Sequence, residues 1–228
     1  MLGIFAMPTC SSSRNHMAQP ALFSGRLADG LAAMRIGLRP EAQETLLAYL
    51  DLLAQWNRAY NLTAVRDGME MVSRHLLDSL AVLPFVHGGT LADLGSGAGL
   101  PGIPLAIARP DLAITLIESN GKKARFLREA VRTLPLPNVT VREARVQDAA
   151  GHFDTVTARA FASLAGMLAW GGHLLADDGR WLAMKGRIDP DEIAAVPEGF
   201  RLVAVHPLEV PGIDGERHLV ELARTSQR

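Results

Sequence analysis

The chain has 228 residues, of which 48% are hydrophobic and 21% charged, and its formal net charge at pH 7 is −1. This composition is ordinary for a soluble protein of one large domain, with or without an extension. No apolar run is long enough to cross a membrane, Cys10 is the single cysteine, and no Cys/His spacing indicates a metal site. We therefore expect a cytoplasmic protein without bound metal or membrane partner, and any nucleic-acid contact must come from a local basic patch.

The first residues lack a periodic pattern. Residues 1–20 contain three consecutive serines and scattered methionines, and no basic segment precedes the short apolar start. A secretory signal is therefore not expected. We predict a flexible tail over 1–20, with Met17 as an alternative start of translation.

Residues 21–88 are predicted to form a helical N-terminal extension. Leu46, Leu50 and Leu53 recur at the spacing of one helix face after Pro40, and that helix is expected to close near Tyr60. A second helical pattern covers 69–83 and includes His75. For a histidine on a mostly apolar face, a structural role is favoured over a ligand contact.

From residue 89 to 228 the pattern changes to alternating strands and helices. Apolar runs of this kind predict a mostly parallel, doubly wound sheet. The last two strands are joined by a Pro/Gly-rich loop without a crossover helix, so the last strand should be antiparallel. The expected strands are Thr90–Leu94, Ala113–Glu118, Val139–Glu143, Phe153–Ala158, Gly179–Lys185, Leu202–Pro207 and His218–Ala223; the expected helices are Pro101–Ala108, Lys122–Leu134, a short piece near Gln147, and Leu164–Leu175.

A glycine-rich turn follows the first predicted strand. Asp93 ends the strand, and Gly95, Ser96 and Gly97 begin a loop that leads into the next helix. Glycine lets the backbone turn sharply and approach a ligand closely, and the helix N-terminus adds unpaired N–H groups. Positions 97–102 also satisfy the dinucleotide pattern G-x-G-x-x-G, so the loop alone does not name its ligand.

Two acidic residues bear on the identity of that ligand. Asp93 would attract the ammonium group of S-adenosylmethionine and repel a pyrophosphate. Glu118, at the end of the second strand, can accept hydrogen bonds from both ribose hydroxyls, as acids also do in NAD sites. The sequence therefore predicts a nucleoside cofactor and favours S-adenosylmethionine over NAD.

A basic stripe is predicted on the helix that follows Glu118. Its members recur every three or four residues, and Lys123 lies beside them; they are Lys122, Arg125, Arg128 and Arg132. A stripe next to a cofactor loop, in a nearly neutral protein, is consistent with RNA binding, and a merely solvated face is an equal alternative. Lys185 and Arg217 are further RNA-binding candidates.

Several segments, taken in order, resemble the RsmG (GidB) family of bacterial 16S rRNA guanine-N7 methyltransferases. They cover residues 40 to 224 and comprise Trp56-Asn57, Asn61-Leu62-Thr63-Ala64, the run from Arg74 to Leu80, the run from Asp93 to Pro104, Glu118-Ser119-x-x-Lys122-Lys123-x-Arg125-Phe126-Leu127, Arg159-Ala160-Phe161-Ala162, Lys185-Gly186 and the run from Glu216 to Val220. The resemblance implies a Rossmann-like methyltransferase fold, S-adenosylmethionine, and a guanine in the decoding-region loop of 16S rRNA.

The same resemblance implies cofactor contacts at five positions. They are Gly95, Leu100, Val146, Gln147 and Arg159. At Gln147 members of this family often have an acid, and a glutamine carbonyl can accept from the adenine amino group more weakly.

Guanine N7 carries a lone pair and no proton, so we expect no catalytic base and no triad. Arg159 and Lys185 are the candidates for positioning the guanine. For Phe161, stacking on the base and packing in the core are equally favoured interpretations. We expect a monomer. Two alternatives stay open: a small-molecule methyltransferase, and a non-catalytic dinucleotide-binding Rossmann domain.

Overall fold

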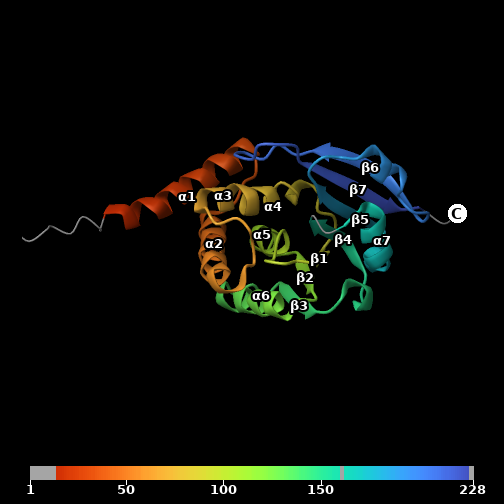
Figure 1. Cartoon of the computed structure of the whole chain (residues 1–228), viewed down its shortest axis with the longest axis horizontal. Helices are drawn as coiled ribbons and strands as arrows, with labels where there is room; N and C mark the ends of the chain where they lie inside the picture. The colour runs from red at the N-terminus through yellow and green to blue at the C-terminus, as the bar shows by residue number, and fades with distance from the viewer. Residues whose placement is uncertain (1–13, 160–161, 226–228) are drawn as a thin grey trace, which may run out of the picture.

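The computed structural model describes residues 14–159 and 162–225 and contains a seven-stranded sheet in the order β3-β2-β1-β4-β5-β7-β6 (Figure 1). The strands are β1 (Thr90–Leu94), β2 (Ala113–Glu118), β3 (Val139–Glu143), β4 (Phe153–Arg159), β5 (Leu175–Lys185), β6 (Phe200–Pro207) and β7 (His218–Arg224). Neighbouring strands from β3 to β5 pair in parallel, and β7 lies antiparallel between β5 and β6. The predicted fold class and the antiparallel last strand are confirmed.

The N-terminal part consists of α1 (Arg14–Ala33), α2 (Pro40–Tyr60), α3 (Gly68–Met71), π-helix η1 (Val72–Leu77), α4 (Asp78–Leu80) and the short 3₁₀ turn η2 (Leu83–Phe85). Helix α1 begins ahead of the predicted boundary at residue 20, and residues 1–13 lie outside the described residues. Figure 1 shows the start of α1 projecting from the rest of the molecule. The helix predicted over 69–83 contains the wider π-turn, which a helical spacing of apolar residues does not reveal.

The remaining helices are α5 (Gly102–Ala108), α6 (Gly121–Thr133), α7 (Leu164–Gly171) and α8 (Pro190–Ala194), with 3₁₀ turns η3 (Val146–Asp148) and η4 (Gly172–Leu174). The helix predicted over 164–175 was too long. Its α-helical part ends at Gly171, and Leu175 already belongs to β5. Helix α8 was not predicted. No helix in the described part of the chain is long and apolar enough to cross a membrane.

The N-terminal helices and one face of the sheet share a hydrophobic cluster. Tyr49 and Leu77 from the extension pack in the same cluster as Leu91 of β1 and Ile103 of α5. The next residue of β1, Ala92, belongs to a second cluster on the opposite face, which α7 covers. This alternation follows from the two-residue period of a strand. The extension therefore packs against one face of the sheet, next to β1 and α5.

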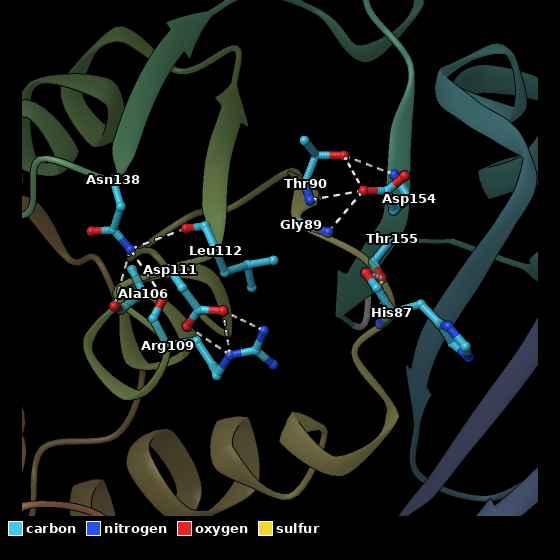
Figure 2. Close-up of polar contacts among 10 residues, drawn as sticks. All are labelled: His87, Gly89, Thr90, Ala106, Arg109, Asp111, Leu112, Asn138, Asp154 and Thr155. Carbon is cyan, nitrogen blue, oxygen red and sulfur yellow. Dashed lines mark hydrogen bonds and ion pairs between the residues drawn. The ribbon is translucent and has the colours of Figure 1, made fainter.

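The amino ends of the central strands are closed by polar contacts, which Figure 2 shows. The Asp154 carboxylate accepts hydrogen bonds from the backbone N–H groups of Gly89 and Thr90 and from the Thr90 hydroxyl, at 2.9 to 3.0 Å. These bonds hold the pKa of Asp154 below its usual range. The Asn138 amide donates to three backbone carbonyls near the end of α5. In sheets of this kind ligands bind at the opposite, carboxyl edge.

Candidate functional site

The loop between β1 and α5 has the backbone conformation expected of a glycine-rich ligand loop. Gly95, Gly97 and Gly99 have φ angles of 64°, 58° and 89°, a region that residues with a side chain rarely adopt. A Cβ on Gly97 would meet only the Gly95 carbonyl, at 3.7 Å, so the space above this residue is open. A Cβ on Gly99 would instead collide with Ile103. Gly97 therefore borders open space with bare backbone, whereas Gly99 permits close packing of the helix.

Helix α2 of the extension holds this loop in place. The buried Tyr49 hydroxyl donates a 2.7 Å hydrogen bond to the Ala98 carbonyl. Burial raises the pKa of Tyr49 far above its usual value, so the hydroxyl keeps its proton. The extension thus fixes the loop directly, through a contact that the sequence pattern did not predict.

Tyr49→Phe is expected to lower the free energy of unfolding by about 1–3 kcal/mol, because the buried Ala98 carbonyl loses its donor. The ring stays, so the core remains filled. Cofactor affinity should fall severalfold as the loop loosens. Urea unfolding and calorimetry test both effects, and Tyr60→Phe, at an exposed position of the same helix, is the control. Unchanged stability in Tyr49→Phe would show that this bond does not hold the loop.

A cavity of about 670 Å³ lies at the carboxyl ends of β1, β2 and β3, and we call it the β1–β3 cavity. Four residues that the sequence predicts to contact a cofactor line this cavity: Gly95, Glu118, Val146 and Gln147. Lys123 and Trp170 line it as well. Trp170, on α7, was missed, although a tryptophan on the helix after β4 could have indicated it. Its ring adds aromatic surface to one wall of the cavity.

Glu118 joins the loop to this cavity. One carboxylate oxygen accepts from the Gly97 N–H and the other from the Asn120 N–H, both at 2.8 Å. The carboxylate is buried and oriented by these two bonds. Each oxygen retains a further lone pair that can accept a hydroxyl hydrogen.

Asp93 lies beneath the loop and does not line the β1–β3 cavity. It is fully buried, and one carboxylate oxygen accepts the Gly102 N–H at 3.1 Å. The other oxygen has no hydrogen-bond partner. Burial raises the pKa of Asp93 to about 7, partly offset by the hydrogen bond from Gly102. Ser96 and Leu100 are also buried, and the Ser96 hydroxyl donates to the Asp93 carbonyl at 2.8 Å.

Arg159 ends β4, beside β1, and faces a second cavity. One guanidinium nitrogen donates to the Arg74 carbonyl at 2.9 Å and lies 3.4 Å from an Asp78 oxygen. Its positive charge lowers the pKa values of both Asp93 and His75. Arg159 therefore does not share the β1–β3 cavity with the four residues above.

The second cavity, the β4–β5 cavity, has a volume of about 240 Å³ and contains Lys185 and Arg217 besides Arg159. The Lys185 ammonium is engaged by Glu192 at 2.6 Å and by the Ala162 carbonyl at 2.8 Å. The ion pair with Glu192 neutralises the charge of Lys185, a residue that the sequence predicts to position a substrate. Asp78, at the base of this cavity, was missed because it lies in an apolar helical pattern.

His75 is buried on the π-helix, and its Nε2 lies 3.0 Å from the Thr63 hydroxyl. Burial lowers the pKa of His75 to about 4, so the ring is neutral near pH 7. These contacts favour the structural role. Phe161, the candidate for stacking on a base, lies outside the described residues.

The basic stripe on α6 is divided by ion pairs. Arg128 contacts Glu143 at 2.8 Å and Arg132 contacts Glu129 at 2.7 Å. Within the described part of the chain, the side chains of Lys122 and Arg125 have no hydrogen-bond or ion-pair partner. Only the first half of the stripe therefore offers uncompensated positive charge.

The sheet order, the glycine loop after β1 and the acidic residue at the end of β2 define a Rossmann-like methyltransferase fold. Solved structures show the same architecture. The pyocyanin biosynthetic protein PhzM matches 75% of this chain and 61% of its own at a TM-score of 0.58 and 15% identity. TrmN from Thermus thermophilus matches 68% and 53% at a TM-score of 0.51 and 17% identity.

Residues 42–220 match the family described as rRNA small subunit methyltransferase G, GidB. Ribosomal RNA small subunit methyltransferase G of Xanthomonas campestris pv. campestris (strain 8004) is 59% identical over 208 residues, 90% of this chain and 97% of that protein. The protein of that name from Stenotrophomonas maltophilia (strain R551-3) is 59% identical over 203 residues, 88% and 95% of the two chains. The chain belongs to this methyltransferase family.

Proposed function

We propose that the protein transfers a methyl group from S-adenosylmethionine to N7 of a guanine in the decoding-region loop of 16S rRNA. The observation that carries this proposal is the β1–β3 cavity, in which the glycine loop meets Glu118, Val146 and Gln147. Membership of the family supports the reaction class and the rRNA substrate.

The residues present fit the cofactor. Glu118 would accept from the ribose hydroxyls, and the Gln147 carbonyl from the adenine amino group. The unpartnered oxygen of Asp93, buried beneath the loop, would supply negative charge to an ammonium group once the carboxyl has lost its proton, and the open space at Gly97 would admit the cofactor against bare backbone. When bound, S-adenosylmethionine supplies a methyl group on a positively charged sulfur.

The protein's contribution to such a transfer is mainly positioning. Guanine N7 attacks with its own lone pair, so no residue has to remove a proton first. Orientation of this kind contributes roughly 7–11 kcal/mol when the two reacting atoms are held in line near contact distance. The β4–β5 cavity is lined by Arg159 at the carboxyl end of β4, the strand that pairs with β1, and this supports it as the place of the acceptor.

The deciding experiment uses the purified protein, labelled S-adenosylmethionine and 16S rRNA from cells that lack the enzyme, naked or in small subunits. We expect label at one guanine N7, mapped by cleavage of the methylated nucleotide. Label at another atom, or in no rRNA, would contradict the proposal. Calorimetry with S-adenosylmethionine and NAD tests the alternative of a dinucleotide-binding domain.

Lys122→Glu/Arg125→Glu is expected to weaken RNA binding about tenfold or more, because these charges on α6 are uncompensated. The slope of log K against log[salt] should fall by roughly 0.7 for each phosphate contact removed from a single strand. Cofactor affinity should stay unchanged. Filter binding across a salt series measures this, and Arg132→Glu, at an ion-paired position of the same helix, is the control. Equal loss in both variants would indicate a general charge effect.

A further inference from the structure

The β4–β5 cavity is built around a buried carboxylate. Asp78 lies at the start of α4, directly after the π-helix, and its side chain is 4% exposed. One of its oxygens is 3.4 Å from Arg159 at the end of β4, and the other is 3.3 Å from Arg217 just before β7. Asp78 thus joins the N-terminal helices to both sides of the cavity.

Stability alone explains this arrangement poorly, because the cost of removing charges from water can exceed the attraction within a buried ion pair. Burial raises the pKa of Asp78, and the charges of Arg159 and Arg217 offset part of that rise. An apolar side chain would fill the same space without that cost. Such a cluster is therefore more readily explained by a ligand than by folding.

Two polar atoms of this cluster lack a hydrogen-bond partner among the described residues. They belong to residues that line the cavity: Arg159 Nη1, and Asp78 Oδ1, whose contact with Arg217 at 3.3 Å is an ion pair only. Buried polar atoms are normally paired, so such a group indicates a polar ligand that completes the bonding.

The size of the cavity fits one base. Its volume is about 240 Å³, larger than the roughly 150 Å³ of an engineered cavity that admits benzene. Glu192 neutralises Lys185, but the charges of Arg159 and Arg217 outweigh that of Asp78, so the lining is net positive, which suits a nucleotide. A guanidinium has five N–H groups, so each arginine can donate to a ligand while it contacts Asp78.

We propose that the β4–β5 cavity holds the acceptor guanine and that Asp78 is a positioning residue, which fixes Arg159 and Arg217 against the guanine O6. This inference rests on the proposed function. Arginine donates to O6, an acceptor in guanine, whereas adenine carries an amino donor at that position. N7 carries no proton, so its lone pair would form the bond to the methyl carbon as the sulfur–carbon bond breaks; the positive charge would pass to the purine and the neutral thioether would leave.

The test compares Asp78→Asn, Arg217→Gln and the double variant of the full chain on 16S rRNA from cells that lack the enzyme. Each single change should lower kcat/KM for RNA at least about 30-fold, as expected when one partner of a buried charge pair is lost. The double variant should lose much less than the product of the two single losses, because both changes break the same unit. Glu70→Gln, which removes an exposed ion pair on α3, is the matched control and should act like wild type.

Multiplicative losses, or wild-type activity in Asp78→Asn, would overturn the inference. If Asp78→Asn does not fold, Arg217→Gln still tests it, since the Arg217 side chain is partly exposed. A second readout is the rate of methylation of a 16S rRNA that carries 2-aminopurine in place of the methylated guanine, relative to the normal rRNA. 2-Aminopurine lacks O6, and the modified rRNA is assembled by ligation. Wild type should discriminate against it, and Arg217→Gln should discriminate clearly less, because one of the two arginine donors to O6 is lost; equal discrimination by both would also overturn the inference. A wild-type protein that methylates no rRNA would instead refute the proposed function.

Discussion

Asp93→Asn is expected to weaken S-adenosylmethionine binding by at least about 100-fold while the protein stays folded, since loss of one partner of a buried ion pair costs roughly 3–5 kcal/mol. The asparagine carbonyl can still accept the Gly102 N–H, so the bond that ties β1 to α5 survives. The amide replaces the unpartnered carboxylate oxygen and removes the charge that an ammonium would meet. Calorimetry measures the affinity, and thermal melting checks the fold.

The pH dependence provides an independent test of the same residue. Because the pKa of Asp93 in the free protein is about 7, its proton must leave before the carboxylate can pair with a cation. Affinity should therefore rise with pH up to about 7, by as much as tenfold per pH unit, and level off above. Asp93→Asn should abolish this dependence. An affinity that is flat with pH in wild type would show that Asp93 is not the ammonium partner.

The same pKa has a consequence for stability. The folded protein holds the Asp93 proton more tightly than the unfolded chain, whose carboxyl has a pKa of 3.8. Between these two values the contribution of Asp93 to the free energy of unfolding falls as pH rises.

Asp154→Asn is a useful contrast, because Asp154 has a lowered pKa at the opposite edge of the sheet. It should lower the melting temperature at neutral pH and leave cofactor affinity unchanged.

Gly97→Val is the second change with a large expected effect, the loss of measurable cofactor binding. The residue has a φ of 58°, and its Cβ would enter open space with only the Gly95 carbonyl nearby. A branched side chain there would occupy the place of the cofactor, and the positive φ would add strain of about 1–3 kcal/mol. Calorimetry with S-adenosylmethionine measures the first effect, and thermal melting the second.

Gly199→Val separates those two effects. Gly199 also has a positive φ, 89°, with no atom within 4 Å of a built Cβ, and it lies in the turn before β6. The two variants should share the strain, and only Gly97→Val should lose the cofactor. Similar affinities in the two variants would show that the loop does not face the ligand.

The sequence by itself determined the sheet and the loop, because both depend on local patterns. Apolar runs bounded by turn residues located all seven strands, and the loop after Asp93 was evident from its glycine spacing. The ends of elements were less certain. Helix α7 ends at Gly171, and a Cβ on the next residue, Gly172, would collide with Phe200, a contact across 28 residues of chain that no local pattern contains.

Only the tertiary structure decided how the candidate residues are grouped. The predicted cofactor residues divide between the β1–β3 cavity, the buried Asp93 and the β4–β5 cavity, because side chains at neighbouring strand ends can point to different sides. The basic stripe is halved by Glu143 and Glu129. Asp78 meets Arg159 and Arg217 only because the sheet brings the end of β4 and the start of β7 beside α4. Burial and pairing depend on contacts distant in sequence, and these determine which charges are available for chemistry.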